Sequence, residues 1–497
     1  MQRNVLDFLE ASAARAPGRI ALADVRGETT YGELLDAARR IGSALAGRVG
    51  RQEGVAVLMD ARDRRCVAAF MGIAYAGCFY APLDPAMPPE RLRRVLGQLR
   101  PALILYDGPG QSAVEALEEK NETLSYEAAV SHAADPAALG SLRLRALETD
   151  VLSVLYTSGS TGMPKGVMQS QRGYVLHTAA IIRRYGFRAA SIFGNQSPFF
   201  YANSVMDLYP ALALGALNVI LPAQAIVFPK RMVELLTAYR VSELVMTPSS
   251  YARVAQAGVL LPGCLPRLRC LIFSGEPASW TSLRAWGEAA PNARLWHIYG
   301  STETYSVAAN SIDRAYSEGE RLPVGPLFPE VKISIQNGMG EEAQEGELLV
   351  SNPWLASGYY REEGLTRAAF PVIGGKRYFQ TGDFVRMDAA GSLTVLGRRD
   401  SQIKHHGYRM DLGELEAALR SLPGWQGGCC LAEEETGEIC CFWTGPLTQG
   451  ELQKGLRGLL PRYALPDRYM YLARLPYTPN GKLDRRHLRG LAREKKR

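Results

Sequence analysis

The segment Tyr156-Thr-Ser-Gly-Ser-Thr-Gly-Met-Pro-Lys-Gly166 follows directly after the apolar run Val151–Tyr156, which has the length of a buried strand. Its internal glycines allow a tight backbone curl that exposes N–H groups, and four hydroxyl side chains and one lysine stand beside them. Such a loop is suited to holding a flexible triphosphate tail. The candidate phosphate-binding residues are Thr157, Ser158, Gly159, Ser160, Thr161, Gly162 and Lys165.

The alternative for this segment is a surface turn rich in glycine and serine. One lysine and four hydroxyls within eleven residues disfavour that alternative. The residue order also differs from the GxxxxGK[ST] pattern, so an ordinary P-loop ATPase does not fit.

Helical and strand-like segments alternate on both sides of this loop, which favours an α/β fold of stacked layers around largely parallel sheets. We expect helices at Tyr31–Leu45 and Glu90–Gln98, and strands at Gly54–Met59, Ala102–Tyr106, Glu243–Met246, Cys270–Phe273 and Leu295–Tyr299.

From about Glu330 the pattern changes to short strands separated by glycine-rich turns, which predicts a small β-unit that closes the large region. The expected strands are Val331–Gln336, Glu347–Ser351, Arg377–Phe379, Phe384–Met387 and Ser392–Leu396.

After Asp400 we expect a smaller α+β domain, with a helix at Leu412–Arg420 and strands at Gly428–Glu433 and Glu438–Trp443. The predicted domains are therefore residues 1–399 and residues 400–497. The charge-rich start of the second domain is typical of an interdomain hinge.

The composition excludes several classes of protein. With 47% hydrophobic and 22% charged residues in 497, the chain is neither disordered nor collagen-like. Eight cysteines are too few for a disulfide scaffold, and the charged N-terminus does not resemble a signal peptide, so we expect a cytoplasmic protein. The uncharged run Tyr209–Pro229 contains three prolines, which favours a helix and a strand over a membrane span.

The net charge of +7 is concentrated near the C-terminus, where residues 468–497 carry ten Lys or Arg against two acidic residues. Such a tail can attract nucleic acid, a membrane or an acidic protein. No nucleic-acid motif accompanies the charge and no aromatic residues alternate with it, so we expect no nucleic-acid partner.

Further motifs carry chemistry at the predicted strand ends. Glu303 in Ile298–Thr304 could hold Mg²⁺, which prefers hard oxygen ligands. Asp383 after Thr381 and Gly382 could accept both hydroxyls of a ribose, and the turn Pro479–Asp484 presents Lys482. Each of these acids alone is a weak signal, since an exposed turn residue is the common alternative.

In their order and spacing, these motifs resemble the adenylate-forming superfamily over essentially the whole chain. Thr30–Leu34 and Ala76–Pro85 match its two N-terminal signatures. Ser204–Pro210 and Pro479–Asp484 resemble most closely the amino-acid adenylation branch, particularly D-alanine–carrier-protein ligases and free-standing adenylation domains of nonribosomal peptide synthesis.

The resemblance implies that a carboxylate attacks the α-phosphorus of ATP, giving acyl-AMP and pyrophosphate, before the acyl group passes to a carrier-protein thiol. It implies that the loop and Lys165 hold phosphates, that Glu303 holds Mg²⁺, and that Lys482 bridges the carboxylate and the AMP moiety. Asp400 would be the hinge, and a face containing Gly407 would serve thioester formation. The remaining implied ATP contacts are Gly275, Glu276, Pro277, Tyr299, Thr302, Asp383 and Arg398.

The segment Tyr201–Ser204 departs from the family, because Ala202 replaces the aspartate that pairs a substrate ammonium. A buried ammonium without a partner is costly. Either the substrate lacks a free α-amine, or another group such as Asn203 accepts from it. The implied acid pocket, mainly apolar, comprises Ala202, Asn203, Met206, Met246, Ile272, Ser274, Ile298, Ser306 and Val307.

Two further patterns are not expected to be sites. The pairs Cys429–Cys430 and Cys440–Cys441 place only alternate side chains on one face of a strand, which favours core cysteines over zinc ligands. His405 and His406 are expected to face solvent.

No carrier segment follows Lys482, so we expect a free-standing enzyme that acts on a carrier protein in trans. The rival acceptor is coenzyme A, which would make the chain an acyl- or aryl-CoA synthetase. A non-catalytic AMP-binding protein is the rival from another class, and retention of Lys165, Glu303, Asp383 and Lys482 argues against it.

Overall fold

The computed structural model describes residues 3–117, 121–157, 164–275, 278, 280–313, 322–398, 402–433, 436–476 and 483–494. The chain divides into two compact units. The first comprises residues 1–85, 99–156 and 166–399, and the second comprises residues 86–98, 157–165 and 400–497.

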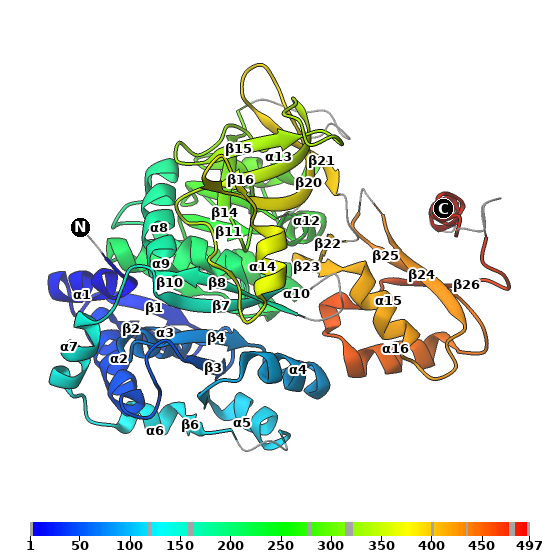
Figure 1. The fold of residues 1–497 in the computed structure, drawn as a ribbon. Coiled ribbons are helices and arrows are strands. Elements are labelled where there is room, and N and C mark those ends of the chain that lie inside the picture. Colours follow the sequence, from blue (N-terminus) through cyan, green and yellow to red (C-terminus); the bar gives the residue numbers. More distant parts are fainter. Residues whose placement is uncertain are drawn as a thin grey trace. The chain divides into compact units, whose positions relative to one another are not determined.

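The larger sheet of the first unit is parallel from β1 to β13 and has an antiparallel strand at each edge (Figure 1). Its strands are, in spatial order, β14 (Tyr305–Ser311), β13 (Arg294–Ser301), β12 (Cys270–Ser274), β11 (Glu243–Met246), β9 (Ile192–Asn195), β10 (Leu217–Ile220), β1 (Ile20–Asp24) and β2 (Gly27–Thr30).

The second sheet of this unit is built around β3 and β4, whose residues are all buried, as expected for parallel strands covered on both faces. Its strands are, in spatial order, β17 (Gly358–Tyr359), β8 (Lys165–Ser170), β7 (Val151–Thr157), β4 (Phe79–Leu83), β3 (Gly54–Leu58), β5 (Leu103–Tyr106) and β6 (Thr123–Ser125). The prediction of stacked α/β layers with largely parallel sheets is confirmed.

Helices α2 (Tyr31–Leu45) and α3 (Arg65–Tyr75) show how closely the layers pack. Thr30 and Glu33 form a capping box at the start of α2, and the helix has the predicted bounds. A Cβ atom added to Gly72 of α3 would lie 2.6 Å from Cβ of Ile41, so this helix contact requires glycine.

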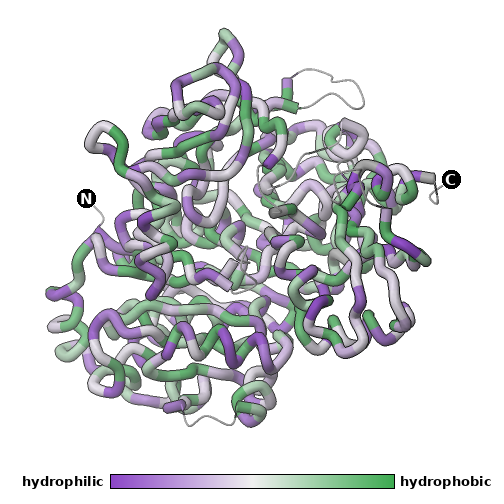
Figure 2. The backbone as a smooth tube through the Cα atoms, turned by 45° about the vertical axis from the view of Figure 1, so that its right-hand side comes forward, coloured by the Kyte–Doolittle hydropathy of each residue, from purple (hydrophilic) through white to green (hydrophobic). Residues whose placement is uncertain are grey.

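Hydrophobic segments alternate with hydrophilic ones along the chain (Figure 2). The other helices of the first unit complete its layers. They are α1 (Val5–Arg15), α5 (Gly108–Glu115), α6 (Tyr126–Ser131), α7 (Pro136–Leu144), α8 (Gln171–Tyr185), the 3₁₀ turn η1 (Ala202–Ser204), α9 (Val205–Leu214), α10 (Gln224–Val227), α11 (Pro229–Ala238), α12 (Pro248–Gln256), α13 (Trp280–Ala289) and α14 (Glu363–Ala369).

The predicted small β-unit is an antiparallel sheet of β15 (Lys332–Gln336), β16 (Glu345–Ser351), β20 (Phe379–Met387) and β21 (Leu393–Arg398). The prediction of separate strands at 377–379 and 384–387 is wrong, because β20 continues through Gly382, whose φ of 73° permits a kink within the strand. Before it, β18 (Val372–Ile373) and β19 (Lys376–Arg377) form their own hairpin.

The second unit contains, after Arg399, a hairpin of β22 (Gln402–His405) and β23 (Tyr408–Asp411). Its two turn residues, His406 and Gly407, both have positive φ, as two-residue hairpin turns of the I′ kind require. Helix α15 (Leu412–Arg420) has the predicted bounds. The other elements are α4 (Pro89–Leu99), β24 (Gly427–Ala432), β25 (Ile439–Thr444), β26 (Arg468–Tyr471), α16 (Gln449–Leu459), the 3₁₀ turn η2 (Arg462–Ala464) and α17 (Arg485–Glu494).

The cysteine pairs lie in the antiparallel strands β24 and β25, where Cys430 stands opposite Cys441. These two thiols belong to one apolar cluster, and Cys429 and Cys440 belong to another. All four are free and buried, which confirms the expectation of core cysteines on alternate faces.

Among the described residues, none of the helices combines the length and the apolar character that a bilayer crossing requires. The uncharged run that begins at Tyr209 forms the end of α9 and the strand β10, as predicted.

Candidate active site

The phosphate loop is described only at its two ends, where Thr157 closes β7 and Lys165 opens β8. The roles predicted for this loop therefore stay predictions. The predicted site residues that lie outside the described part of the chain are Ser158, Gly159, Ser160, Thr161, Gly162, Glu276, Pro277, Asp400 and Lys482.

Asp383, Tyr299 and Arg398, which the sequence named separately, meet in the first unit. Asp383 of β20 stands opposite Arg398 of β21, and Arg398 Nη1 lies 2.6 Å from Asp383 Oδ1. The hydroxyl of Tyr299, near the end of β13, donates to Asp383 Oδ2. Burial, reinforced by this carboxylate, raises the pKa of Tyr299 well above its usual value, so the phenol keeps its proton.

The backbone around Asp383 fixes its orientation. The Thr381 hydroxyl accepts from the Asp383 N–H at 3.0 Å and donates to the Leu348 carbonyl at 2.8 Å. Each Asp383 oxygen already accepts one of the bonds described above, and a carboxylate oxygen has two lone pairs. The buried carboxylate can therefore accept one further hydroxyl on each oxygen, as the predicted ribose contact requires.

Glu303 lies in the tight turn between β13 and β14, and its side chain is buried. The Tyr359 hydroxyl donates to Glu303 Oε1 at 3.0 Å, and the Gln169 amide donates to the Thr302 carbonyl at 2.6 Å. A carboxylate is the hard oxygen ligand that Mg²⁺ prefers, so this residue fits the predicted metal contact.

The residues predicted for the acid pocket come from η1, α9 and the neighbouring strands β11 to β14. The Ser274 hydroxyl donates to Asn203 Oδ1 at 3.2 Å, and the Ser306 hydroxyl lies 3.4 Å from Met206 Sδ. Asn203 Nδ2 is buried and has no hydrogen-bond partner among the described residues. Hydrogen bonds therefore connect Asn203 with Ser274 and Met206 with Ser306. Met246, Ile272, Ile298 and Val307 are buried hydrophobic residues of the strands.

Gly275, which follows β12, adopts a φ of 103°. A side chain there would be strained, so the positive φ explains the glycine. Its predicted contact with the adenine stays a prediction.

His177 of α8 is a pocket neighbour that sequence reasoning missed. Its Nε2 lies 3.0 Å from the Ser306 hydroxyl, and its ring stacks on Tyr305 with centroids 4.7 Å apart. Burial lowers its pKa to about 3, so the imidazole is neutral. Because 129 residues separate His177 from Ser306, no local pattern could have found the pair.

Asp207 of α9 is a further buried carboxyl group, and it is close in sequence to the pocket residues of η1 and α9. Its Oδ1 accepts from Asn195 Nδ2 at 2.7 Å and from Asn218 Nδ2 at 3.4 Å. Burial raises its pKa to about 7, because the two amides offset only part of the cost of a buried charge.

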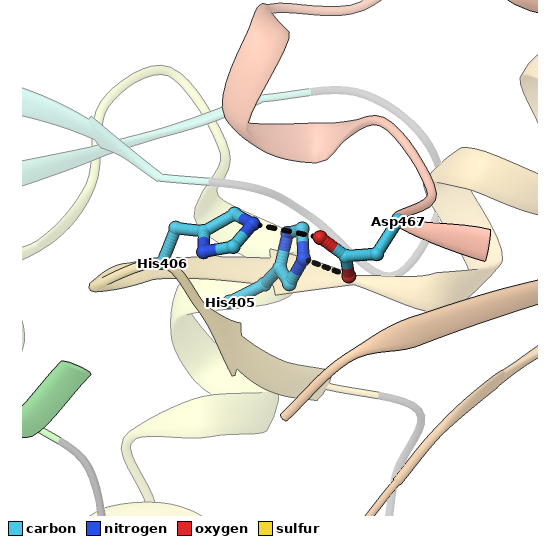
Figure 3. Close-up of side chains that lie close together, drawn as sticks. All are labelled: His405, His406 and Asp467. Atoms are coloured by element: carbon cyan, nitrogen blue, oxygen red, sulfur yellow. Dashed lines mark hydrogen bonds and ion pairs between the residues drawn. The ribbon is translucent and has the colours of Figure 1, made fainter. Parts of the chain in front are cut away.

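The expectation for His405 is wrong, whereas His406 is exposed as expected. The side chain of His405 is 1% exposed, and its Nε2 lies 2.7 Å from Asp467 Oδ2. The side chain of His406 is 58% exposed, and its Nε2 lies 2.9 Å from Asp467 Oδ1 (Figure 3). Burial acts to raise the pKa of Asp467, but the hydrogen bonds from the two histidines outweigh it and hold that pKa well below its usual value.

Comparison with known proteins identifies a matching family and relatives over nearly the whole chain. A family profile described as AMP-binding enzyme matches residues 9–360. The chain is 29% identical over 507 residues to the D-alanine–D-alanyl carrier protein ligase of Bacillus licheniformis, covering 98% of this chain and 99% of that one. It is also 29% identical over 498 residues to bacitracin synthase 1 of the same species, covering 97% of this chain. The chain spans only 9% of that synthase.

Among solved structures, the fold is similar to the Vibrio cholerae adenylation domain AlmE in complex with glycyl-adenosine-5′-phosphate. The TM-score is 0.85, with 22% identity over 99% of this chain and 98% of that one.

Proposed function

The chain belongs to the family of AMP-binding enzymes and is an adenylate-forming ligase, and we propose that it joins a small carboxylic acid to a carrier-protein thiol by way of an acyl-AMP. A carboxylate oxygen attacks the α-phosphorus of ATP, the bond to the bridging oxygen breaks, and pyrophosphate leaves. The thiol then attacks the acyl carbon, AMP leaves with the bonding electrons, and the thiol proton passes to solvent.

The observation that carries the proposal is the convergence of Tyr299 and Arg398 on the carboxylate of Asp383. This arrangement holds the carboxylate in place while leaving lone pairs for two ribose hydroxyls. Glu303 would supply an oxygen ligand to Mg²⁺, which neutralises charge on the departing phosphates. Lys482, as the sequence motif implies, would place a positive charge beside the attacked phosphorus.

The acid pocket favours a substrate with an oxygen acceptor over an α-ammonium group. Ala202 offers no carboxylate, and Asn203 Oδ1 already accepts from Ser274. The amide nitrogen Nδ2 has no partner within the described part of the chain, and a buried donor without a partner is costly. A hydroxyl or carbonyl oxygen on the substrate would satisfy it, so we favour hydroxy or keto acids over ordinary α-amino acids.

The direct test is acid-dependent release of pyrophosphate from ATP and Mg²⁺, with α-amino, β-amino, hydroxy, keto and aryl acids compared. We expect a response to a hydroxy or keto acid. Asn203→Leu should weaken this response by at least about tenfold, because one hydrogen bond to the substrate is lost. A response confined to α-amino acids would contradict the assigned substrate class. If none of the acids in the panel causes pyrophosphate release, the proposed function itself is contradicted.

Lys482→Ala tests the role of the C-terminal motif. We expect acyl-AMP formation to fall by orders of magnitude while ATP binding is largely kept, because the lysine acts on the charge that develops at phosphorus. Adenylation at the original rate would contradict this role.

The acceptor is tested by offering either coenzyme A or a holo-carrier protein to the loaded enzyme. We favour the carrier because carrier proteins tend to be acidic and the last 30 residues hold a surplus of eight positive charges. Charge reversal at Arg485, Arg486 and Arg489 should slow carrier acylation and weaken its salt dependence. Faster transfer to coenzyme A would instead identify an acyl-CoA synthetase.

A further inference from the structure

Three side chains of the second unit converge, and none of them is assigned above to ATP or to the acid. Within the described part of the chain, His405, His406 and Asp467 are the group of three whose ligand atoms all lie within 4.8 Å of one another (Figure 3). They come from the β22–β23 hairpin and from the residue before β26.

The hydrogen bonds of His405 fix the state of its ring. Its Nδ1 lies 2.6 Å from the carbonyl oxygen of Tyr463, which can only accept, so Nδ1 carries a hydrogen. That leaves Nε2 directed at Asp467. In metal sites, a ligating histidine commonly donates its other N–H to a backbone carbonyl, which fixes the tautomer and the orientation of the ring.

Both imidazoles direct Nε2 at the same carboxylate, at 2.7 Å for His405 and 2.9 Å for His406. A nitrogen lone pair facing a carboxylate oxygen is repulsive, so each Nε2 must either carry a hydrogen or share a cation with the carboxylate. Two protons, one on each Nε2, satisfy the group. One divalent cation can take the place of both hydrogens and leaves both imidazoles neutral, the form in which histidine binds metals.

The scaffold around the three side chains is built to hold them. The rings of Tyr408 and Tyr463 stack with their centroids 3.9 Å apart and an interplanar angle of 9°. This contact joins the hairpin to η2. The backbone N–H of Ile439 donates to Asp467 Oδ2 at 2.7 Å and orients the carboxylate. His406 is more than half exposed, so an ion can enter from solvent.

We propose that His405, His406 and Asp467 bind a divalent transition-metal ion of the zinc class through the two Nε2 atoms and the carboxylate. Imidazole nitrogen suits zinc, nickel or copper, whereas Mg²⁺ prefers oxygen ligands. Ligands at about 2.1 Å in a tetrahedral site lie about 3.4 Å apart. The ion therefore fits if the nitrogen–oxygen distances, now 2.7 and 2.9 Å, lengthen by about 0.7 and about 0.5 Å. Three protein ligands leave a fourth position for water.

The experiment titrates the full-length protein with Zn²⁺ by calorimetry in excess Mg²⁺, and repeats the titration with Co²⁺ to record the absorption spectrum. The variant is His406→Asn, because the side chain is exposed and asparagine tolerates the positive φ of this turn. His405 is buried and stays unchanged. The matched controls are His132→Asn and His487→Asn, two exposed histidines outside the group.

We expect one equivalent of Zn²⁺ to bind the parent and both controls with the same affinity, and His406→Asn to bind at least about tenfold more weakly. At one fixed Zn²⁺ concentration, the ion should raise the Tm of the parent and of the controls more than that of His406→Asn, because an ion that binds only the folded state stabilises it more when it binds more tightly. The absence of saturable binding, or equal affinity in His406→Asn, would show that the group is a hydrogen-bonded ion pair and would overturn the proposal.

Discussion

Two aspartates, one in each unit, accept hydrogen bonds from two side chains yet are suited to different chemistry. Asp383 accepts from Arg398 and Tyr299, whose donor atoms cannot give up a proton near neutral pH to become metal ligands. Asp467 accepts from two histidines, which can each lose a proton and present a lone pair. The chemistry of the donors therefore decides whether a carboxylate serves as an acceptor for hydroxyls or as part of a metal site.

The largest expected effect comes from Asp383→Asn, which breaks the pair with Arg398. We expect kcat/KM for ATP in pyrophosphate release to fall about 100-fold or more. The reason is that the two charge-assisted hydrogen bonds from the ribose hydroxyls to this carboxylate are weakened at once. The matched variant Asp467→Asn should change that value less than about threefold. Similar losses in the two variants would remove the distinction drawn between the two aspartates.

Asp207 is a third aspartate with a different set of donors, two neutral amides. Burial raises its pKa to about 7 from an ordinary value of 3.8. Between these values the folded state holds a proton that the unfolded state has released. Stability therefore falls as pH rises from about 4 to about 7, by about 4 kcal/mol for this group. Asp207→Asn should remove that slope, as measured by urea unfolding at about pH 5 and about pH 8.

A parent protein whose stability does not fall more steeply than that of Asp207→Asn between these two conditions would contradict the assignment. The variant should fold, because the amide oxygen can still accept from both asparagines. The second carboxyl oxygen has no partner to lose among the residues that the structure describes.

The smallest expected effect is that of Tyr299→Phe, which removes one neutral donor and keeps Arg398. We expect KM for ATP to rise about tenfold or less, with kcat nearly unchanged, because one hydrogen bond is lost. A loss as large as that of Asp383→Asn would mean that the phenol, and not the arginine, holds the carboxylate.

The local sequence was sufficient to predict a helix where the residues that determine it lie within or next to that helix. The bounds of α2 were predicted from its helical periodicity, and the structure adds a capping box of Thr30 and Glu33 at its start. The family motifs named Tyr299 and Asp383 separately, and the fold brings them together across 84 residues.

Sequence reasoning failed where residues far along the chain determine whether a side chain is buried, or where a local backbone angle determines the length of a strand. His405 was expected in solvent, but its acceptors Tyr463 and Asp467 lie 58 and 62 residues further along the chain. The length of β20 was missed because a glycine within a strand is usually an interruption, whereas Gly382 kinks the strand without ending it. Neither the tertiary partner nor the local φ is visible in a single sequence.

The close approach of α2 and α3 at Gly72 has a consequence for mutational tolerance. An added methyl group there meets Ile41 and the Ala38 carbonyl, so even alanine should wedge the two helices apart and lower expression. A Cβ atom added to Gly140 of α7 would meet no other atom within 4 Å, so alanine there should instead add up to about 1 kcal/mol of helix stability. A saturation library would thus distinguish the glycines that close helix packing requires from those whose replacement makes the enzyme more stable.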